Sequence, residues 1–124
     1  MVENGGDIFV RCSRPLVFTL YAGEESPFTG RLRFSPQGQG SFGVCTSSGT
    51  VGHSKSFGKA DAVCVIARDA AVADAAATAL CNRIVSDADL DRVMEAAAAD
   101  GEIMGLITAM GERIGVWGCV EIVR

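Results

Sequence analysis

Apolar and polar positions along the chain predict strands on both sides of a pair of helices. Residues 62–67 form a continuous apolar run, which is typical of a strand buried on both of its faces. Residues 8–10 and 16–21 are rich in β-branched and aromatic side chains, so we expect two early strands that pair with each other. Residues 31–34 alternate charged and apolar side chains, as a strand with one solvated face does. A further strand, 41–46, leads into a polar loop.

The helices are indicated by their capping residues and their apolar spacing. Asp69 is a favourable N-cap and predicts a helix over about 70–85. Ser86, followed by Asp89 three residues later, resembles a capping box and predicts the start of a second helix, which Gly101 would end. Apolar residues then recur at helical spacing: Leu90, Val93, Met94 and Ala97.

The end of the sequence predicts a closing hairpin, because the runs 104–109 and 114–123 flank a polar turn at 110–113. Together the elements indicate the α+β class, with a mainly antiparallel sheet and two helices packed on one face. The 124 residues, of which 48% are hydrophobic, predict a single domain over residues 1–124.

Composition and charge limit the classes of partner that we expect. No apolar run approaches the roughly 20 residues of a membrane span, so we expect no membrane partner. A net charge of −4 and the lack of a basic block disfavour nucleic acid. The cysteines are widely spaced, without a CxxC pair or zinc-ligand spacing, and mostly lie in apolar runs. We therefore expect reduced core cysteines in a cytoplasmic protein: Cys12, Cys45, Cys64, Cys81 and Cys119.

The polar loop 46–56 gathers most of the side chains that could do chemistry. It holds six hydroxyl groups, two glycines, Lys55 and the only histidine, His53. Backbone N–H groups around glycines can bind an anion, and Lys55 or Lys59 could neutralise a phosphate. The spacing is not that of a Walker loop, and a serine-rich turn can equally be only a turn. His53 can act either as a base or as a structural hydrogen-bonding residue.

A polar stripe runs along the alanine-rich helix. Asp74, Thr78 and Asn82 are spaced four apart and drift by only about 40° per step, so they share one face, with Cys81 beside them. An aspartate buried on such a helix is costly unless it is paired or binds a metal, and its oxygens suit Mg²⁺ or Ca²⁺. The alternative is that Asp74 is a first-turn acid favoured by the helix dipole, while Thr78 bonds back to its own helix.

Three segments together resemble a known family. ENGGDI from Glu3, TSSGTVGHSKSFGKADAV from Thr46 and ADAAATAL from Ala73 resemble an uncharacterised family related to bacterial FAD:protein FMN transferases, the ApbE-like proteins. The GGD element of the transferases is similar to Gly5-Gly6-Asp7, and their ADALATAL string is similar to residues 73–80. Their TSG motif is similar to Thr46-Ser47-Ser48-Gly49.

The resemblance implies two cofactors, Mg²⁺ and a flavin nucleotide (FAD or FMN). In the transferases the Asp and Thr of the last motif hold Mg²⁺ beside the FAD pyrophosphate, a role that falls here on Asp74 and Thr78. An acceptor threonine of a partner protein would attack the FMN phosphorus, and His53 or a carboxylate could assist removal of its proton. The nucleotide would be bound by residues of the first and second segments: Asn4, Gly5, Gly6, Asp7, Thr46, Ser47, Ser48, Gly49, Thr50, His53 and Ser54.

The sequence also departs from the transferase pattern. Their segment after TSG is longer and carries an IIDPxTG-like string, whereas the segment here is short. The resemblance covers only about their C-terminal half, so we expect this chain to be the C-terminal part of a larger flavin-transferase-like domain. Three functions stay open: a flavin-nucleotide-binding, Mg²⁺-dependent protein acting on a phosphoanhydride, a binding or assembly module that lost the chemistry, and a structural fragment.

The buried run 62–67 leads to an expectation about partners. The two helices can cover one face of the strand, and the remaining strands and turns are too few to cover the other. A bare sheet face would expose an apolar patch larger than the few hundred Å² that monomers usually tolerate. We therefore expect the chain to associate with the missing N-terminal half or with a second copy.

Overall fold

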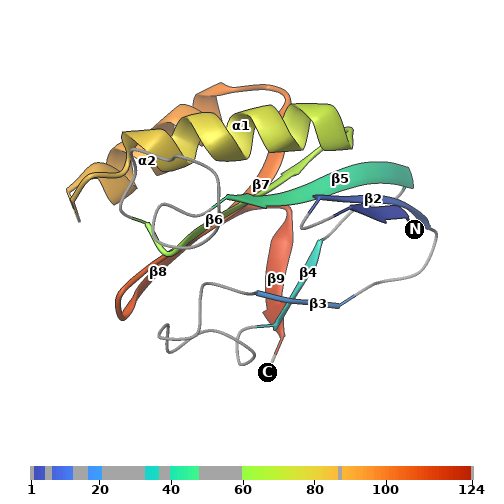
Figure 1. Cartoon of the computed structure of the whole chain (residues 1–124), viewed down its shortest axis with the longest axis horizontal. Helices are drawn as coiled ribbons and strands as arrows, with labels where there is room; N and C mark the ends of the chain where they lie inside the picture. The colour runs from blue at the N-terminus through green and yellow to red at the C-terminus, as the bar shows by residue number, and fades with distance from the viewer. Residues whose placement is uncertain are drawn as a thin grey trace.

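A six-stranded antiparallel sheet forms the centre of the molecule (Figure 1). The computed structural model describes residues 2–4, 7–12, 17–20, 33–36, 40–47, 60–86 and 88–123. Within them the strand order is β1-β2-β5-β6-β7-β8. Their bounds are β1 (Val2–Asn4), β2 (Asp7–Cys12), β5 (Gly40–Ser47), β6 (Ala62–Ala67), β7 (Ile103–Met110) and β8 (Arg113–Gly118).

Both faces of this sheet are covered. Helices α1 (Ala70–Arg83) and α2 (Asp89–Ala99) lie on one face, and a three-stranded sheet lies on the other (Figure 1). The small sheet has the order β3-β4-β9, with β3 (Phe18–Thr19), β4 (Arg33–Pro36) and β9 (Val120–Val123). The predicted α+β class, with a mainly antiparallel sheet and helices on one face, is confirmed.

Strand β6 lies between two hydrophobic cores, because its side chains alternate between them. Val63 and Val65 point to the helices, and Cys64 and Ile66 point to the small sheet. All six residues of β6 are buried, as the apolar run predicts. The expectation that one face would stay bare is wrong, because Phe34, Val120 and Ile122 of the small sheet pack against it. That reason for expecting a partner is therefore removed.

The helix boundaries follow the predicted capping residues in part. Asp69 caps α1, since its carboxylate accepts a hydrogen bond from the backbone N–H of Val72 at 2.8 Å. Helix α2 begins at Asp89, not at Ser86 as predicted. The carboxylate of Asp89 nevertheless accepts backbone N–H bonds from Val85 (2.9 Å) and Ser86 (3.0 Å). These bonds stabilise the ionised form and hold its pKa below the ordinary value.

Three strand predictions need correction. The run 16–21 does not pair with the first strand, because its described part, β3, pairs with β4 in the other sheet. The alternating strand predicted at 31–34 continues to Pro36, where the alternation ends because both further residues are buried. Its first two residues, 31 and 32, lie outside the described residues. The run 114–123 is two strands, because Gly118 adopts a φ of +87° and directs the chain from the large sheet into the small one.

The cysteines are not all core residues. Cys45, Cys64 and Cys81 are buried and unoxidised, as expected, but Cys119 is exposed where the chain passes between the two sheets. The side chain of Cys12 lies outside the described residues. Neither described helix has the length and apolar character that crossing a membrane would need.

Candidate functional site

Helix α1 lies directly on strand β5, and this contact positions the candidate site. At Gly43 the helix backbone comes so close that an added Cβ would lie 2.4 Å from the Ala70 nitrogen and from the Asp69 carbonyl carbon. Two residues further along β5, the Cys45 thiol donates a hydrogen bond to the Ala70 carbonyl at 3.3 Å. Because β5 touches α1 at successive points, the end of the strand meets the second turn of the helix and beyond.

The contact at the end of β5 joins two of the predicted site residues. The Ser47 Oγ and Thr78 Oγ1 atoms are 3.2 Å apart and form a hydrogen bond, although the residues are separated by 31 positions in sequence. The structure thus brings Thr78 to Ser47, the second residue of the 46–56 segment. Residues 48–56 of that segment lie outside the described residues. Both hydroxyl groups are accessible to a ligand, since the bond between them is exposed.

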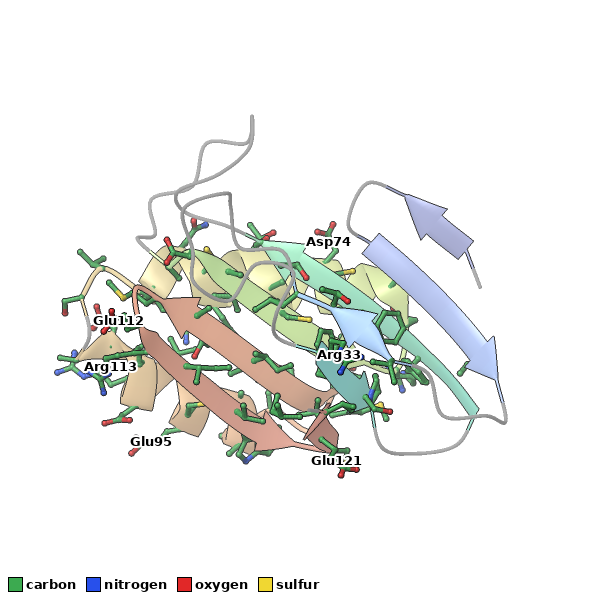
Figure 2. All side chains as sticks on the ribbon, turned by 90° about the horizontal axis from the view of Figure 1, so that it is seen from below. Arg33, Asp74, Glu95, Glu112, Arg113 and Glu121 are labelled. Atoms are coloured by element: carbon green, nitrogen blue, oxygen red, sulfur yellow. The ribbon has the colours of Figure 1, made fainter. Side chains whose placement is uncertain are left out.

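Asp74 lies one turn before Thr78 and is exposed, so the cost of a buried aspartate does not arise. Helix α1 begins at Ala70 and has no acid in its first turn, so the alternative that Asp74 is a first-turn acid is wrong. Figure 2 shows its side chain near the end of β5, on the side where β2 begins. The physical reason is that the helix turns a different stripe to the core: Ala73, Ala77, Leu80, Cys81 and Ile84. Cys81 therefore belongs to the core instead of the polar stripe, while Asn82 is half-buried.

Thr46 points away from Ser47, to the opposite face of the sheet. It pairs with Cys64 across the strands, and its side chain hydrogen-bonds that thiol. Burial raises the pKa of the Cys64 thiol to about 12, with the Thr46 bond opposing the rise. Cys64 is therefore a protonated core thiol at neutral pH, and Thr46 is placed away from the face that carries Ser47 and Thr78.

The backbone of the N-terminal element is brought to the same end of β5. Asn4 pairs with Asp7 in the β1–β2 hairpin, and Asp7 pairs with Cys45 of β5. The side chains of Asn4 and Asp7 lie outside the described residues. So do the remaining predicted nucleotide-binding and catalytic residues, and both candidate lysines: Gly5, Gly6, Ser48, Gly49, Thr50, His53, Ser54, Lys55 and Lys59.

The donor atoms gathered here are oxygens. The described part of the chain holds no group of three or more His, Cys, Asp or Glu side chains close enough to bind a metal ion. What it offers is the pair of hydroxyls on Ser47 and Thr78, with the exposed carboxylate of Asp74 one turn earlier. Such hard oxygen donors fit Mg²⁺, which keeps several waters and needs only one or two protein ligands when a phosphate supplies others.

Comparison with known proteins assigns a family. The protein-family model described as "AbpE bacteria" matches residues 1–105. The chain belongs to the AbpE bacteria family. The family-level part of the resemblance found in the sequence is thereby confirmed.

The AbpE family assignment is accompanied by close relatives in methanogens. A UPF0280 protein of Methanothrix thermoacetophila is 44% identical over 124 residues, covering 100% of this chain and 52% of the relative. A UPF0280 protein of Methanosarcina barkeri is 45% identical over 121 residues, covering 97% of this chain and 47% of the relative. A UPF0280 protein of Methanocaldococcus jannaschii is 40% identical over 131 residues, covering 100% of this chain and 53% of the relative. This AbpE family chain thus spans about half the length of the curated relatives it matches.

Sequence reasoning missed the residue that sets the helix against the strand. At Gly43 the backbone of α1 lies close against β5, and the signal was present, since a glycine inside a strand often marks a close approach of another backbone. Cys45 was expected only to be buried, but its thiol also bonds the first turn of α1.

Proposed function

We propose that this chain forms part of a flavin-nucleotide site, specific for FAD or FMN and dependent on Mg²⁺, in a protein of FMN-transferase ancestry that acts on a phosphoanhydride. The observation that carries the proposal is the 3.2 Å contact between Ser47 and Thr78. It joins the TSSG segment to the ADAAATAL helix, the two segments that resemble the nucleotide- and metal-binding motifs of the transferases. The name of the family model, AbpE, supports a relation to these ApbE-like proteins.

The roles in this site follow from the donor atoms. Thr78 and Asp74 supply a hydroxyl and a carboxylate from successive turns of α1, and these would hold the Mg²⁺. When bound, the ion supplies charge neutralisation to the pyrophosphate of the nucleotide. Ser47 orients the Thr78 hydroxyl through their hydrogen bond, and it stands at the start of the segment proposed to bind the phosphates.

The nucleotide would lie at the shared end of β5 and the β1–β2 hairpin. The register that sets Asp7 against Cys45 brings the backbone of Asp7, the last residue of the GGD element, next to the strand that ends in Ser47. His53 remains the proposed residue for assisting proton removal from an acceptor. Because the chain spans about half of each relative, the rest of the flavin pocket and the acceptor are part of the proposal as well.

The second function that the sequence leaves open is nucleotide binding without catalysis. Hydroxyls and a carboxylate can bind a metal–nucleotide complex, whereas proton transfer needs a group whose pKa is near the working pH. His53, the candidate for that group, lies outside the described residues.

Incubation of the purified chain with FAD, with and without Mg²⁺, separates the two functions. Release of AMP, followed by chromatography, identifies an enzyme; retention of flavin without AMP identifies a binding protein. We expect Asp74→Asn and Thr78→Val each to weaken Mg²⁺-dependent FAD binding at least tenfold by calorimetry, since each removes a hard donor. Both variants should keep wild-type thermal stability within the range of surface substitutions, about 0.5 kcal/mol.

Matched controls are available at exposed positions away from the site. Asp91→Asn on the solvent side of α2 and Thr19→Val in the small sheet make the same chemical changes. They should leave binding unchanged. Equal FAD affinity in wild type, Asp74→Asn and Thr78→Val would reject the metal site.

A further inference from the structure

Strand β8 is the edge of the six-stranded sheet, and from its pattern we propose that two copies of this chain join there. In the proposed dimer, β8 of one copy pairs antiparallel with β8 of the second copy, and the two sheets become continuous. The inference is independent of the proposed function, because β8 belongs to neither segment of the candidate site.

The edge lacks the features that normally prevent strand pairing. The described part of the chain places β7 on one side of β8 and no strand on the other. Natural edge strands are usually protected by lysine, proline, a bulge or a charge pointing inward. The sequence RIGVWG of β8 contains neither lysine nor proline, and its register with β7 has no bulge. Its one charged residue, Arg113, stands at the start of the strand.

The core also extends to this edge without being covered there. Ile114 and Val116 are 39% and 42% exposed. Across the strands they pair with Ala109 and Ile107, both of which are buried in the core between the two sheets. The apolar layer under the large sheet therefore reaches β8, where the small sheet no longer shields it.

The pattern of β8 makes a second copy the matching partner. An antiparallel pair of identical strands has a two-fold axis, so each contact occurs twice. With the axis at Gly115, Ile114 of one copy faces Val116 of the second copy, and four β-branched side chains meet on one face. Such cross-strand apolar pairs are favourable in sheets.

On the helix side of the sheet, the proposed β8–β8 pairing is compatible with the same register. Gly115 lies beneath the side chain of Met94 from α2, where an added Cβ would be 2.3 Å from the Met94 methyl carbon. Gly115 facing Gly115 of the second copy thus places no side chain at the axis on the helix side. A register displaced by one residue would turn the apolar pair to opposite faces and lose their contact.

Charge does not oppose this register. Arg113 of one copy stands opposite the uncharged Trp117 of the second copy, so no like charges meet within the paired residues. The contact of one short strand is small beside a standard interface of about 1,600 Å², so the dimer should dissociate in the micromolar range.

Sedimentation equilibrium of the full chain from about 1 to 500 µM tests the proposal. We expect a reversible monomer–dimer equilibrium, and Ile114→Lys/Val116→Lys should raise the dissociation constant at least tenfold. Val17→Lys is the matched control, because Val17 is also an exposed β-branched residue (53%) but lies outside the large sheet. It should leave the dissociation constant unchanged.

Each outcome of the sedimentation experiment decides a different part of the proposal. A chain that stays monomeric over the whole concentration range overturns the proposal. A dimer that resists the two lysines overturns the β8 pairing. If such a monomer forms a complex with the additional region of a longer relative, that region is the occupant of the edge instead.

Discussion

Replacement of Gly43 by alanine is the most direct test of how the candidate site is positioned. The new Cβ would lie 2.4 Å from the Ala70 nitrogen, 2.4 Å from the Asp69 carbonyl carbon and 2.5 Å from the Ala70 Cα. All three are backbone atoms at the start of α1, so no side-chain rotation can relieve the overlap. The helix would have to move away from β5 by about 1 Å to reach ordinary contact distance.

The loss of folding stability in Gly43→Ala can be estimated from this displacement. Overpacking a well-packed interior costs about 1–3 kcal/mol, and we take the upper end because rigid backbone must move. For a chain of this size about 3 kcal/mol corresponds to a fall in Tm of roughly 12 °C. Moving α1 also separates Thr78 from Ser47, so FAD binding should weaken even at temperatures where the variant is fully folded.

Thermal and urea unfolding followed by circular dichroism measure the stability. Gly101→Ala is the control, because an added Cβ there meets no atom within 4 Å and the residue does not adopt a positive φ. That variant should be neutral or slightly more stable, by up to about 1 kcal/mol. If Gly43→Ala unfolds at the same urea concentration as Gly101→Ala, the close packing of α1 on β5 is wrong.

Two further substitutions test buried and capping polar groups. Among the described residues the buried hydroxyl of Thr108 has no hydrogen-bond partner, so Thr108→Val should raise the free energy of unfolding by about 1 kcal/mol, while Thr19→Val at an exposed position should not. Asp89→Ala should lower Tm at pH 7, because it removes the acceptor of two backbone N–H bonds. The folded-state pKa of Asp89 is lowered, so its contribution is complete above the unfolded-state pKa and is lost as pH falls through the folded-state value. The Tm difference from wild type should therefore shrink below about pH 4, and a pH-independent difference would contradict the capping role.

Features set by neighbours in sequence could be predicted well. The Asp69 cap depends on a bond to Val72, three residues away, and the burial of β6 follows from its apolar run. The polar stripe that includes Thr78 follows from helical spacing alone. Each of these signals lies within one element, where propensity and pattern act directly.

Features set by distant segments could not be predicted. The pairing of β4 with β9 depends on contacts across most of the chain, and it decides that the second face of β6 is covered. The run 114–123 reads as one strand because its apolar pattern is continuous, while the division depends on the backbone of a single glycine, Gly118. The exposure of Asp74 is set by which stripe of α1 meets the sheet, and small alanines on several sides leave that choice to tertiary packing.

The pairing of β4 with β9 has a consequence for folding during synthesis. Arg33 pairs with Val123, which is made 90 residues later. At roughly 5–20 residues per second, a ribosome needs about 5 to 20 s to supply that partner. During this interval Phe34, which ends 2% exposed between the two sheets, has only the two-residue strand β3 as a neighbour within its own sheet. The nascent chain therefore carries β4 with one side unpaired for many seconds, which is the period when a holding chaperone is most useful to it.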